Sequence, residues 1–226
     1  MKLSEQTVVV TGANGASGSA LVDYLRGKAA HVVGCLHGQE VDWRPADDGL
    51  SYVTCNLTDR VAVNFMVAEI LRARETFHAW INTVGGYAGN GPVEEVPPSA
   101  WPSMFDLNFI TCLNTCQAIL PVLKEQQFGR IINFGSVAGE TGLALASPYA
   151  MSKAAVHNLT LSMAQELSGQ VTVNLLVPAT IDTPANRESM PAADFATWTR
   201  PETIAEKVAE ILDEAGDPPS GEKFYV

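Results

Sequence analysis

Short apolar segments alternate with amphipathic segments along the chain, and this alternation limits the possible fold more than any other feature of the sequence. The apolar segments, such as residues 7–10 and 171–177, are rich in β-branched residues, as buried strands are. Strands that are apolar throughout and separated by helices form a parallel sheet with helices on both faces. We therefore predict one doubly wound, Rossmann-type α/β domain over residues 1–226, with about seven strands.

The same periodicity gives the expected bounds of the individual elements. Strands are predicted at residues 7–10, 31–36, 51–54, 77–84, 130–134, 171–177 and 223–226. Helices are predicted around 21–25 with an end near Gly27, and then at 59–75, 101–126, 147–167 and 202–214. Residues 179–199 are rich in Pro, Thr and Asp, and an irregular segment of this length in a compact domain is usually functional. We expect this segment to cover a substrate.

Charge and cysteine content argue against several classes of protein. The chain has 25 acidic and 14 basic residues, a net charge of −11, whereas nucleic acids and anionic membranes bind clustered Lys and Arg. The four cysteines form no Cys-x-x-Cys pair and the four histidines are scattered, so we expect no metal site. Unpaired cysteines, an early first strand and the lack of a long apolar run predict a cytoplasmic protein without membrane span or signal peptide.

A glycine-rich turn, TGANGASG at residues 11–18, follows the first predicted strand and precedes the first predicted helix. In a doubly wound fold this turn brings backbone amides and a helix N-terminus to the pyrophosphate of a dinucleotide. Glycine lets the backbone approach the phosphates closely and adopt positive φ. We expect six residues of this turn to bind the cofactor: Gly12, Asn14, Gly15, Ala16, Ser17 and Gly18.

The end of the second predicted strand leaves the choice between NAD and NADP open. Chains of this fold that bind NAD usually carry Asp or Glu there, which binds the ribose hydroxyls. Here the segment reads GCLHG at residues 34–38 and contains no carboxylate. His37 either accommodates a 2′-phosphate or simply ends the strand in solvent. Asn56 and Leu57, just after the third predicted strand, are expected beside the adenine.

Tyr149 and Lys153 form a candidate pair for proton transfer. At helical spacing of four residues, their side chains leave the same face of a predicted helix. A free Tyr has a pKa of about 10, and an ammonium about 4 Å away can lower it enough for proton exchange at neutral pH. Burial opposes this shift, so the positive charge of an oxidised nicotinamide would have to help.

Ser136 ends the fifth predicted strand, at the carboxyl edge where open parallel sheets bind ligands. Its hydroxyl would orient a substrate carbonyl while Tyr149 exchanges a proton and a nicotinamide exchanges a hydride. Asn108 lies inside a predicted helix, where Asn is unfavourable, and is a further candidate. Together with the glycine turn, these residues predict a nicotinamide-dependent redox site.

The chain resembles the short-chain dehydrogenase/reductase family over nearly its whole length. The resemblance implies an enzyme that uses NAD or NADP, with the catalytic Asn, Ser, Tyr and Lys of the family at Asn108, Ser136, Tyr149 and Lys153. The Asn-Asn-Ala-Gly element of the family corresponds to NTVG at residues 82–85, and its Pro-Gly-x-x-x-Thr element to PATIDT at 178–183. Besides Tyr149 and Lys153, the resemblance therefore implies cofactor contacts from Val84, Gly85, Pro178, Ile181 and Thr183.

The glycine turn departs from the usual Thr-Gly-x-x-x-Gly-x-Gly of short family members, because its middle glycine is Gly15 and residue 16 is Ala. The resulting Gly-x-x-Gly-x-x-Gly spacing is similar to that of the extended, sugar-nucleotide-modifying branch. Members of that branch are much longer and carry an added substrate domain, so the length of this chain argues against that branch.

Two segments are similar to dihydropteridine reductase, namely GGYAG at residues 85–89 and residues 181–198. That group reduces a quinonoid pterin with Tyr and Lys and lacks the Ser, whereas this chain keeps Ser136 and Asn108, the fuller set for carbonyls. The resemblance implies a small carbonyl or pterin-like substrate, with quinonoid dihydropteridine reductase itself as the alternative. Candidate substrate contacts, which could equally anchor their loops, are Tyr87, Met190 and Trp198.

Two further expectations concern turnover and assembly. A dinucleotide-binding redox sensor without turnover would fit the fold, but such proteins normally lose the Tyr or the Lys. Family members usually pair through the long helices predicted here at 101–126 and 147–167, which implies a homodimer or homotetramer. A small-molecule substrate is the only other expected partner.

Overall fold

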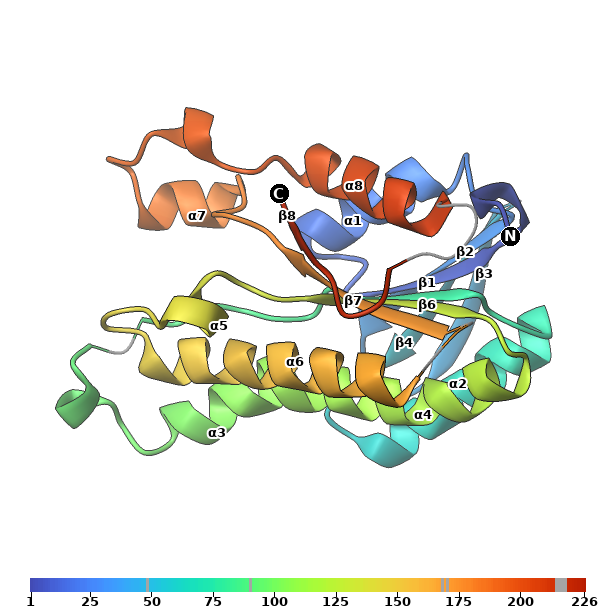
Figure 1. The fold of residues 1–226 in the computed structure, drawn as a ribbon, viewed down its shortest axis with the longest axis horizontal. Coiled ribbons are helices and arrows are strands. Elements are labelled where there is room, and N and C mark those ends of the chain that lie inside the picture. Colours follow the sequence, from blue (N-terminus) through green and yellow to red (C-terminus); the bar gives the residue numbers. More distant parts are fainter. Residues whose placement is uncertain (48, 90, 168, 170, 214–218) are drawn as a thin grey trace.

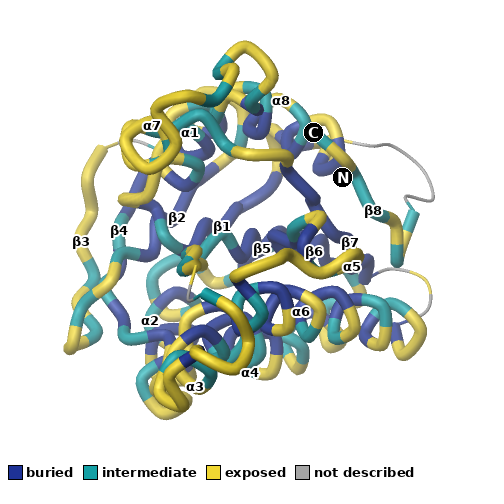
Figure 2. The backbone as a smooth tube through the Cα atoms, turned by 90° about the vertical axis from the view of Figure 1, so that its left-hand side faces the viewer, coloured by how far each residue is buried: buried dark blue, intermediate teal, exposed yellow. Residues whose placement is uncertain are grey.

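The computed structural model describes the 226-residue chain except residues 48, 90, 168, 170 and 214–218. One 8-stranded sheet lies between two layers of helices (Figure 1). Its order is β3-β4-β2-β1-β5-β6-β7-β8 (Figure 2). Its strands are β1 (Thr7–Thr11), β2 (His31–His37), β3 (Asp42–Asp47), β4 (Leu50–Cys55), β5 (Ala79–Asn82), β6 (Gly129–Phe134), β7 (Val171–Val177) and β8 (Lys223–Tyr225). Neighbouring strands are parallel except for β3 and β4. The predicted doubly wound sheet is confirmed.

Helices cover both faces of the sheet (Figure 2), with α1 and α8 on one face and α2, α4 and α6 on the other. The α-helices are α1 (Ala16–Leu25), α2 (Arg60–Arg74), α3 (Ala100–Phe105), α4 (Thr111–Glu125), α5 (Ala138–Thr141), α6 (Ser147–Glu166), α7 (Pro184–Ser189) and α8 (Pro201–Asp213). The predicted last residue of the final helix, Glu214, lies outside the described residues. Within the described part of the chain, no helix is both long and apolar enough to span a bilayer.

The two faces of the sheet bury separate apolar clusters, which explains why the strands are apolar throughout. On one face Val9 packs in a cluster with Trp80 and Ile119. On the other face its neighbour Val8 packs in a cluster with Leu21. All four of these side chains and Val8 itself are fully buried. Alternate residues of each central strand therefore serve opposite faces.

Strand β3 was not predicted from the sequence, and it raises the strand number from about seven to eight. It pairs antiparallel with β4 at the edge of the sheet, and most of its residues are exposed. Its sequence, DWRPAD, has no apolar run, and Pro45 removes a backbone donor. Such an edge strand leaves no hydrophobic pattern to detect.

The helix predicted at residues 101–126 consists of three consecutive parts. A π-helical segment, Asp106–Ile110, joins α3 to α4. Single π-helical turns inside α-helices occur often at functional sites. Here the segment buries Asn108, a residue that is 1% exposed.

The segment predicted to be irregular, residues 179–199, contains α7 and a 3-10 turn at Phe195–Thr197. Its two ends meet, because Ile181 and Thr199 form a parallel bridge. Thr183 caps α7 by accepting a hydrogen bond from the backbone N–H of Asn186 at 3.1 Å. The segment is therefore an ordered loop next to β7.

Candidate active site

A cavity of about 1010 Å³ lies at the carboxyl ends of the central strands, where ligands bind in open parallel sheets. Most of the residues predicted for the site line this cavity: Gly12, Asn14, Gly15, Ala16, Ser17, Gly18, His37, Asn56, Leu57, Val84, Gly85, Tyr87, Ser136, Tyr149, Lys153, Pro178, Ile181, Thr183 and Met190. Two predicted residues, Asn108 and Trp198, are not among the described residues that line it.

The glycine turn forms a tight cradle at the N-terminus of α1. Gly12 has a φ of 65°, and the backbone N–H of Gly15 donates to its carbonyl at 2.9 Å. A Cβ atom on Gly18 would lie 2.1 Å from the Gly12 carbonyl oxygen, so this position needs glycine. The glycine turn and the N-terminus of α1 line the cavity, which fits a dinucleotide pyrophosphate.

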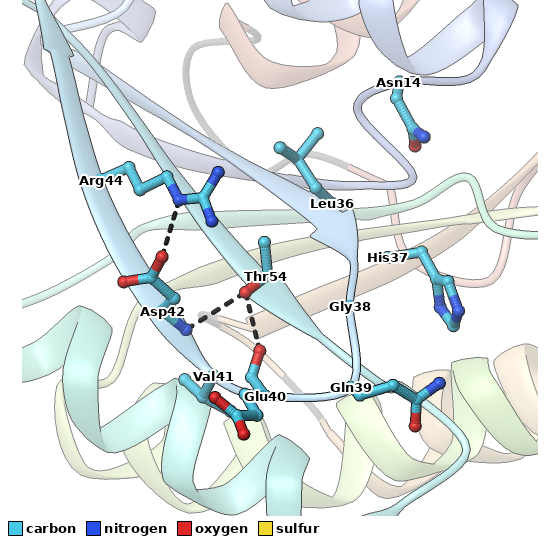
Figure 3. Close-up of a pocket in the computed structure, with 10 residues that line it drawn as sticks. All are labelled: Asn14, Leu36, His37, Gly38, Gln39, Glu40, Val41, Asp42, Arg44 and Thr54. Atoms are coloured by element: carbon cyan, nitrogen blue, oxygen red, sulfur yellow. Dashed lines mark hydrogen bonds and ion pairs between the residues drawn. The ribbon is translucent and has the colours of Figure 1, made fainter.

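A second hollow, of about 700 Å³, adjoins the cavity at the end of β2 and shares Asn14, Leu36 and His37 with it (Figure 3). Arg44 of β3 lines this hollow and forms an ion pair with Asp42 at 2.7 Å. Arg44 and His37 could therefore bind a 2′-phosphate in this hollow, and the carboxylates of Glu40 and Asp42 could bind ribose hydroxyls. Sequence reasoning missed the β3 residues because it missed the strand.

The turn between β2 and β3 is held by the hydroxyl of Thr54 (Figure 3). Its Oγ1 donates to the Glu40 carbonyl at 2.7 Å and accepts from the backbone N–H of Asp42 at 3.2 Å. A Cβ atom on Gly38 would lie 2.7 Å from Thr54 Cβ, so the turn packs closely on β4. These contacts fix the backbone next to His37.

A polar contact from α4 holds the segment after β4, where the adenine was expected. Asn114 of α4 donates through Nδ2 to the carbonyls of Leu57 at 3.0 Å and Thr58 at 3.1 Å. Asn56 Oδ1 in turn accepts from the backbone N–H of Thr58 at 3.1 Å. Asn114 was not predicted, although a buried Asn within an apolar helix face is a usable signal.

The proton-transfer pair lies on α6, and Ser136 follows β6. Lys153 Nζ donates to the Phe134 carbonyl at 2.9 Å. Burial lowers the pKa of Lys153 to about 8. Burial raises the pKa of Tyr149, a hydrogen bond with Ser136 lowers it, and the nearby Tyr87 raises it. Ser136, Tyr149 and Lys153 are thus brought together as predicted.

The expected lowering of the Tyr149 pKa by Lys153 is not found in the protein alone. Desolvation of the phenolate is the largest influence on Tyr149, and Lys153 is not among the causes of its shift. Lys153 is itself buried and holds its charge less readily than a solvated amine. An additional positive charge in the cavity is therefore needed to bring the pKa of Tyr149 toward neutrality.

Asn108 lies behind the cavity wall and contacts α6. Its Nδ2 donates to Ser152 Oγ at 3.1 Å, and Ser152 Oγ donates to the Tyr149 carbonyl at 2.7 Å. A Cβ atom on Gly85 would lie 2.6 Å from Asn108 Oδ1 and 3.1 Å from Lys153 Nζ. Asn108 therefore lies next to the pair on α6 and supports its backbone.

Apolar side chains form the outer part of the cavity. The ring of Tyr87 meets that of Tyr149 edge to face, with centroids 5.2 Å apart. Met190 also lines this part, as do three residues that sequence reasoning missed: Leu107, Val137 and Leu143. Tyr87, Met190 and these three residues are all large, apolar and exposed. The described residues that line the cavity include no Asp, Glu or Arg, and Lys153 is the only Lys among them.

Trp198 anchors the 179–199 loop. Its ring packs on the ring of Phe195, with centroids 4.8 Å apart. The Arg187 guanidinium also lies 4.8 Å from the centroid of the Phe195 ring. Arg187 also binds Asp182 through two hydrogen bonds, at 2.6 and 2.7 Å. This is the alternative that the sequence left open for Trp198, whereas Tyr87 and Met190 face the cavity.

Comparison with known proteins agrees with this geometry. Residues 6–194 match the family described as short chain dehydrogenase. An uncharacterized oxidoreductase of Staphylococcus aureus (strain N315) is 29% identical over 211 residues, which are 86% of this chain and 89% of that protein. The 3beta-hydroxysteroid dehydrogenase of Mediterraneibacter gnavus is 27% identical over 224 residues, or 96% of this chain and 77% of that protein.

Solved structures agree on the fold. The ligand-free aldohexose dehydrogenase of Thermoplasma acidophilum is similar with a TM-score of 0.86 at 22% identity, over 99% of this chain and 93% of that one. The family match spans most of the residues that build the sheet and the cavity. The chain therefore belongs to the short-chain dehydrogenase family and is an NAD(P)-dependent oxidoreductase.

Proposed function

We propose that the chain transfers a hydride between NAD(P)(H) and a small, neutral carbonyl or pterin-like compound, with Tyr149 exchanging the proton. The observation that carries this proposal is the convergence of Ser136, Tyr149 and Lys153 on one cavity that also contains the glycine cradle. The other site residues predicted from the sequence are proposed to bind the cofactor or support this group.

Each residue of the pair on α6 has a distinct task in this reaction. The Tyr149 hydroxyl donates its proton to the substrate oxygen during reduction and takes it back during oxidation. Ser136, which hydrogen-bonds with Tyr149, binds the same oxygen and orients it. The bound nicotinamide supplies or accepts the hydride. Lys153, with a pKa of about 8, holds a positive charge at neutral pH and would bind the ribose of the cofactor, whose oxidised nicotinamide would supply the further positive charge that the tyrosinate needs.

The cavity lining supports a neutral substrate with an apolar body. Lys153 is the only Asp, Glu, Lys or Arg among the described lining residues, and Tyr87, Leu143 and Met190 present apolar surface near Tyr149. A cationic substrate would lose its hydration there with no acidic partner among the described lining residues, and an anionic one would find only the buried Lys153. The similar 3beta-hydroxysteroid dehydrogenase is named for an alcohol, whose oxidation yields a carbonyl. This name supports the carbonyl class.

Quinonoid dihydropteridine reductase is the second candidate. Tyr87 supports it, because its exposed ring stands beside Tyr149 and offers an aromatic face for a flat heterocycle. The resemblance of residues 85–89 and 181–198 to that group points the same way. Ser136 separates the candidates, since pterin reduction in that group proceeds without the Ser.

Steady-state assays test the proposal. NADH and NADPH are each combined with quinonoid dihydropterin and with a panel of neutral ketones, and the corresponding alcohols are used in the oxidising direction. Tyr149→Phe should lower kcat about a thousandfold while cofactor binding, followed by fluorescence, persists. Ser136→Ala should lower turnover of ketones and leave turnover of the pterin unchanged. Full turnover by Tyr149→Phe on a confirmed substrate would contradict the mechanism.

Assembly and location extend the proposal. We propose a homodimer or homotetramer formed through the long helical layer of α4 and α6, as in other family members. All four cysteines are buried and free, which fits a reducing, cytoplasmic environment. Light scattering at micromolar concentration tests the assembly, and a strictly monomeric mass would contradict it.

A further inference from the structure

His157 is a buried imidazole on α6 to which the proposed reaction assigns no role. It follows Lys153 by four residues and therefore lies on the same helical face. The residue as a whole is only 5% exposed. The backbone N–H of Ser136 donates to His157 Nε2 at 3.1 Å. His157 thus binds the backbone of the residue that carries the proposed carbonyl-binding hydroxyl.

The imidazole fits closely against the end of β6. A Cβ atom on Gly135 would lie 2.4 Å from His157 Nε2, so only glycine leaves room for the ring. The backbone N–H of Gly135 donates to the Leu176 carbonyl at 2.8 Å. The sheet holds this backbone from one side and the imidazole from the other, which fixes Ser136 at the cavity wall.

Glu140 of α5 lies on the other side of the imidazole. His157 Nδ1 is 3.9 Å from Glu140 Oε1. Glu140 accepts hydrogen bonds from Lys223 Nζ at 2.7 Å and from the Tyr225 hydroxyl at 2.9 and 3.1 Å. The last strand, β8, is therefore connected to Ser136 through two side chains.

The hydrogen bonds define the protonation state of this network. Because Nε2 accepts from a backbone N–H, a neutral His157 carries its proton on Nδ1, which faces Glu140. The charged groups facing it are Glu140 from α5, Lys223 from β8 and Lys153 from α6. Burial lowers the pKa of His157 most, Glu140 raises it, and the two lysines lower it. A protonated ring would direct an N–H at the N–H of Ser136 and break that hydrogen bond.

We propose that His157 and Glu140 are positioning residues that hold Ser136 in its reactive place, supported by Lys223 and Tyr225 of β8. The inference rests on the proposed role of Ser136 in carbonyl reduction. Neither His157 nor Glu140 exchanges a proton with the substrate. Protonation of His157 releases the backbone of Ser136, so turnover falls in acid.

Two substitutions of the imidazole separate positioning from simple packing. His157→Gln keeps an acceptor near the position of Nε2 but cannot be protonated in this range. His157→Leu keeps most of the apolar volume and removes the acceptor. Glu140→Gln keeps the size of the support and removes its charge. If His157→Leu fails to fold, His157→Gln still tests the proposal through its pH dependence.

The first readout needs no substrate. The backbone amide resonance of Ser136 is followed by NMR against pH, together with the ring resonances of His157. In the unsubstituted protein both should titrate with the same midpoint, and in His157→Gln the Ser136 amide should show no such transition. A Ser136 amide that ignores the titration of His157 would overturn the proposal.

The second readout is kinetic, with NADPH and a neutral ketone. His157→Leu should lower kcat about tenfold, with the KM for NADPH changed less than about twofold. His157→Gln should keep most of kcat and lose the acid decline of the unsubstituted protein. Equal kcat and equal pH profiles for the two variants would overturn the positioning role.

Ser136→Ala distinguishes the possible failures. If Ser136→Ala lowers kcat and His157→Leu does not, the positioning role is wrong while the proposed function stands. If Ser136→Ala leaves kcat on the ketone unchanged, the proposed role of Ser136 is wrong and the inference falls with it.

Discussion

Asn108 and Gly86 are joined by two hydrogen bonds. The backbone N–H of Gly86 donates to Asn108 Oδ1 at 2.9 Å, and Asn108 Nδ2 donates to the Gly86 carbonyl at 3.1 Å. The side-chain amide therefore pairs with this residue as a neighbouring strand would pair with it. This pairing fixes the segment that follows β5, where Gly85 borders Lys153.

Replacing this amide should destabilise the fold. Asn108→Leu leaves both backbone groups of Gly86 without their partner, and the expected loss in free energy of unfolding is about 3 kcal/mol. Urea unfolding followed by circular dichroism measures this loss. The control is Asn64→Leu, because Asn64 is exposed on α2, outside the helices proposed for assembly. Equal stability of the two variants would mean that the pairing contributes nothing.

Gly85→Ala should disturb the site although it adds only one methyl group. The added Cβ would meet Asn108 Oδ1 at 2.6 Å and Lys153 Nζ at 3.1 Å, so one of these groups must move. We expect kcat to fall about tenfold or more, because a small displacement of aligned groups is costly. The matched control is Gly27→Ala, where an added Cβ meets no atom within 4 Å. Unchanged kcat in Gly85→Ala would contradict the placement of these groups.

Lys153→Met should stabilise the folded chain at neutral pH while it removes activity. Burial lowers the pKa of Lys153 from 10.5 to about 8, which corresponds to roughly 3 kcal/mol against folding below pH 8. The loss of the hydrogen bond to the Phe134 carbonyl offsets about 1 kcal/mol of the gain. Urea unfolding at pH 7 should therefore show a more stable variant, and a less stable one would contradict this.

The same pKa predicts how stability changes with pH. The unfolded chain keeps the Lys153 proton up to its ordinary pKa of 10.5, whereas the folded chain loses it at about 8. The unfolded state then binds more protons between these values, so the free energy of unfolding contributed by Lys153 rises with pH there. The difference between the unsubstituted protein and Lys153→Met should shrink from pH 7 to pH 10. A constant difference would contradict the low pKa.

His37→Asp should shift cofactor preference toward NADH. A carboxylate at the end of β2 binds ribose hydroxyls and repels a 2′-phosphate, so the ratio of kcat/KM for NADPH to that for NADH should fall about tenfold. His37→Asn is the control, because it removes the imidazole without adding charge. If both variants change the ratio equally, the charge at this position does not select the cofactor.

The sequence predicted the site well wherever local pattern and chain order decide the structure. Buried strands of the central sheet are apolar on both faces, so the parallel sheet and its carboxyl edge follow from the pattern. Helical spacing of four residues places Tyr149 and Lys153 together without any knowledge of the tertiary fold. Ser136 is found because it lies two residues after the end of a buried strand, β6, at the carboxyl edge of the sheet.

The features that were missed depend on contacts distant in sequence or on exposed segments. His157 meets Ser136 across 21 residues, and Lys223 meets Glu140 across 83 residues, and no periodicity encodes either contact. Strand β3 is exposed and charged, so its pairing with β4 is visible only in three dimensions. The sequence indicated that burial opposes a low pKa of Tyr149, but how strongly it does so depends on the packing of Tyr87 and other neighbours.

The π-helical segment has a consequence for deletions in this helix. Such a segment holds one residue more than an α-helical turn, so it sets the faces of α3 and α4 out of phase by about 100°. Deleting one residue within Asp106–Ile110 would restore an unbroken α-helix and rotate everything before the cut relative to everything after it. Either Met104, buried in α3, or Thr115, buried in α4, would then lose its place in the interior. Deletion of a single residue here would therefore rotate a whole helix and would not be confined to the site of the deletion.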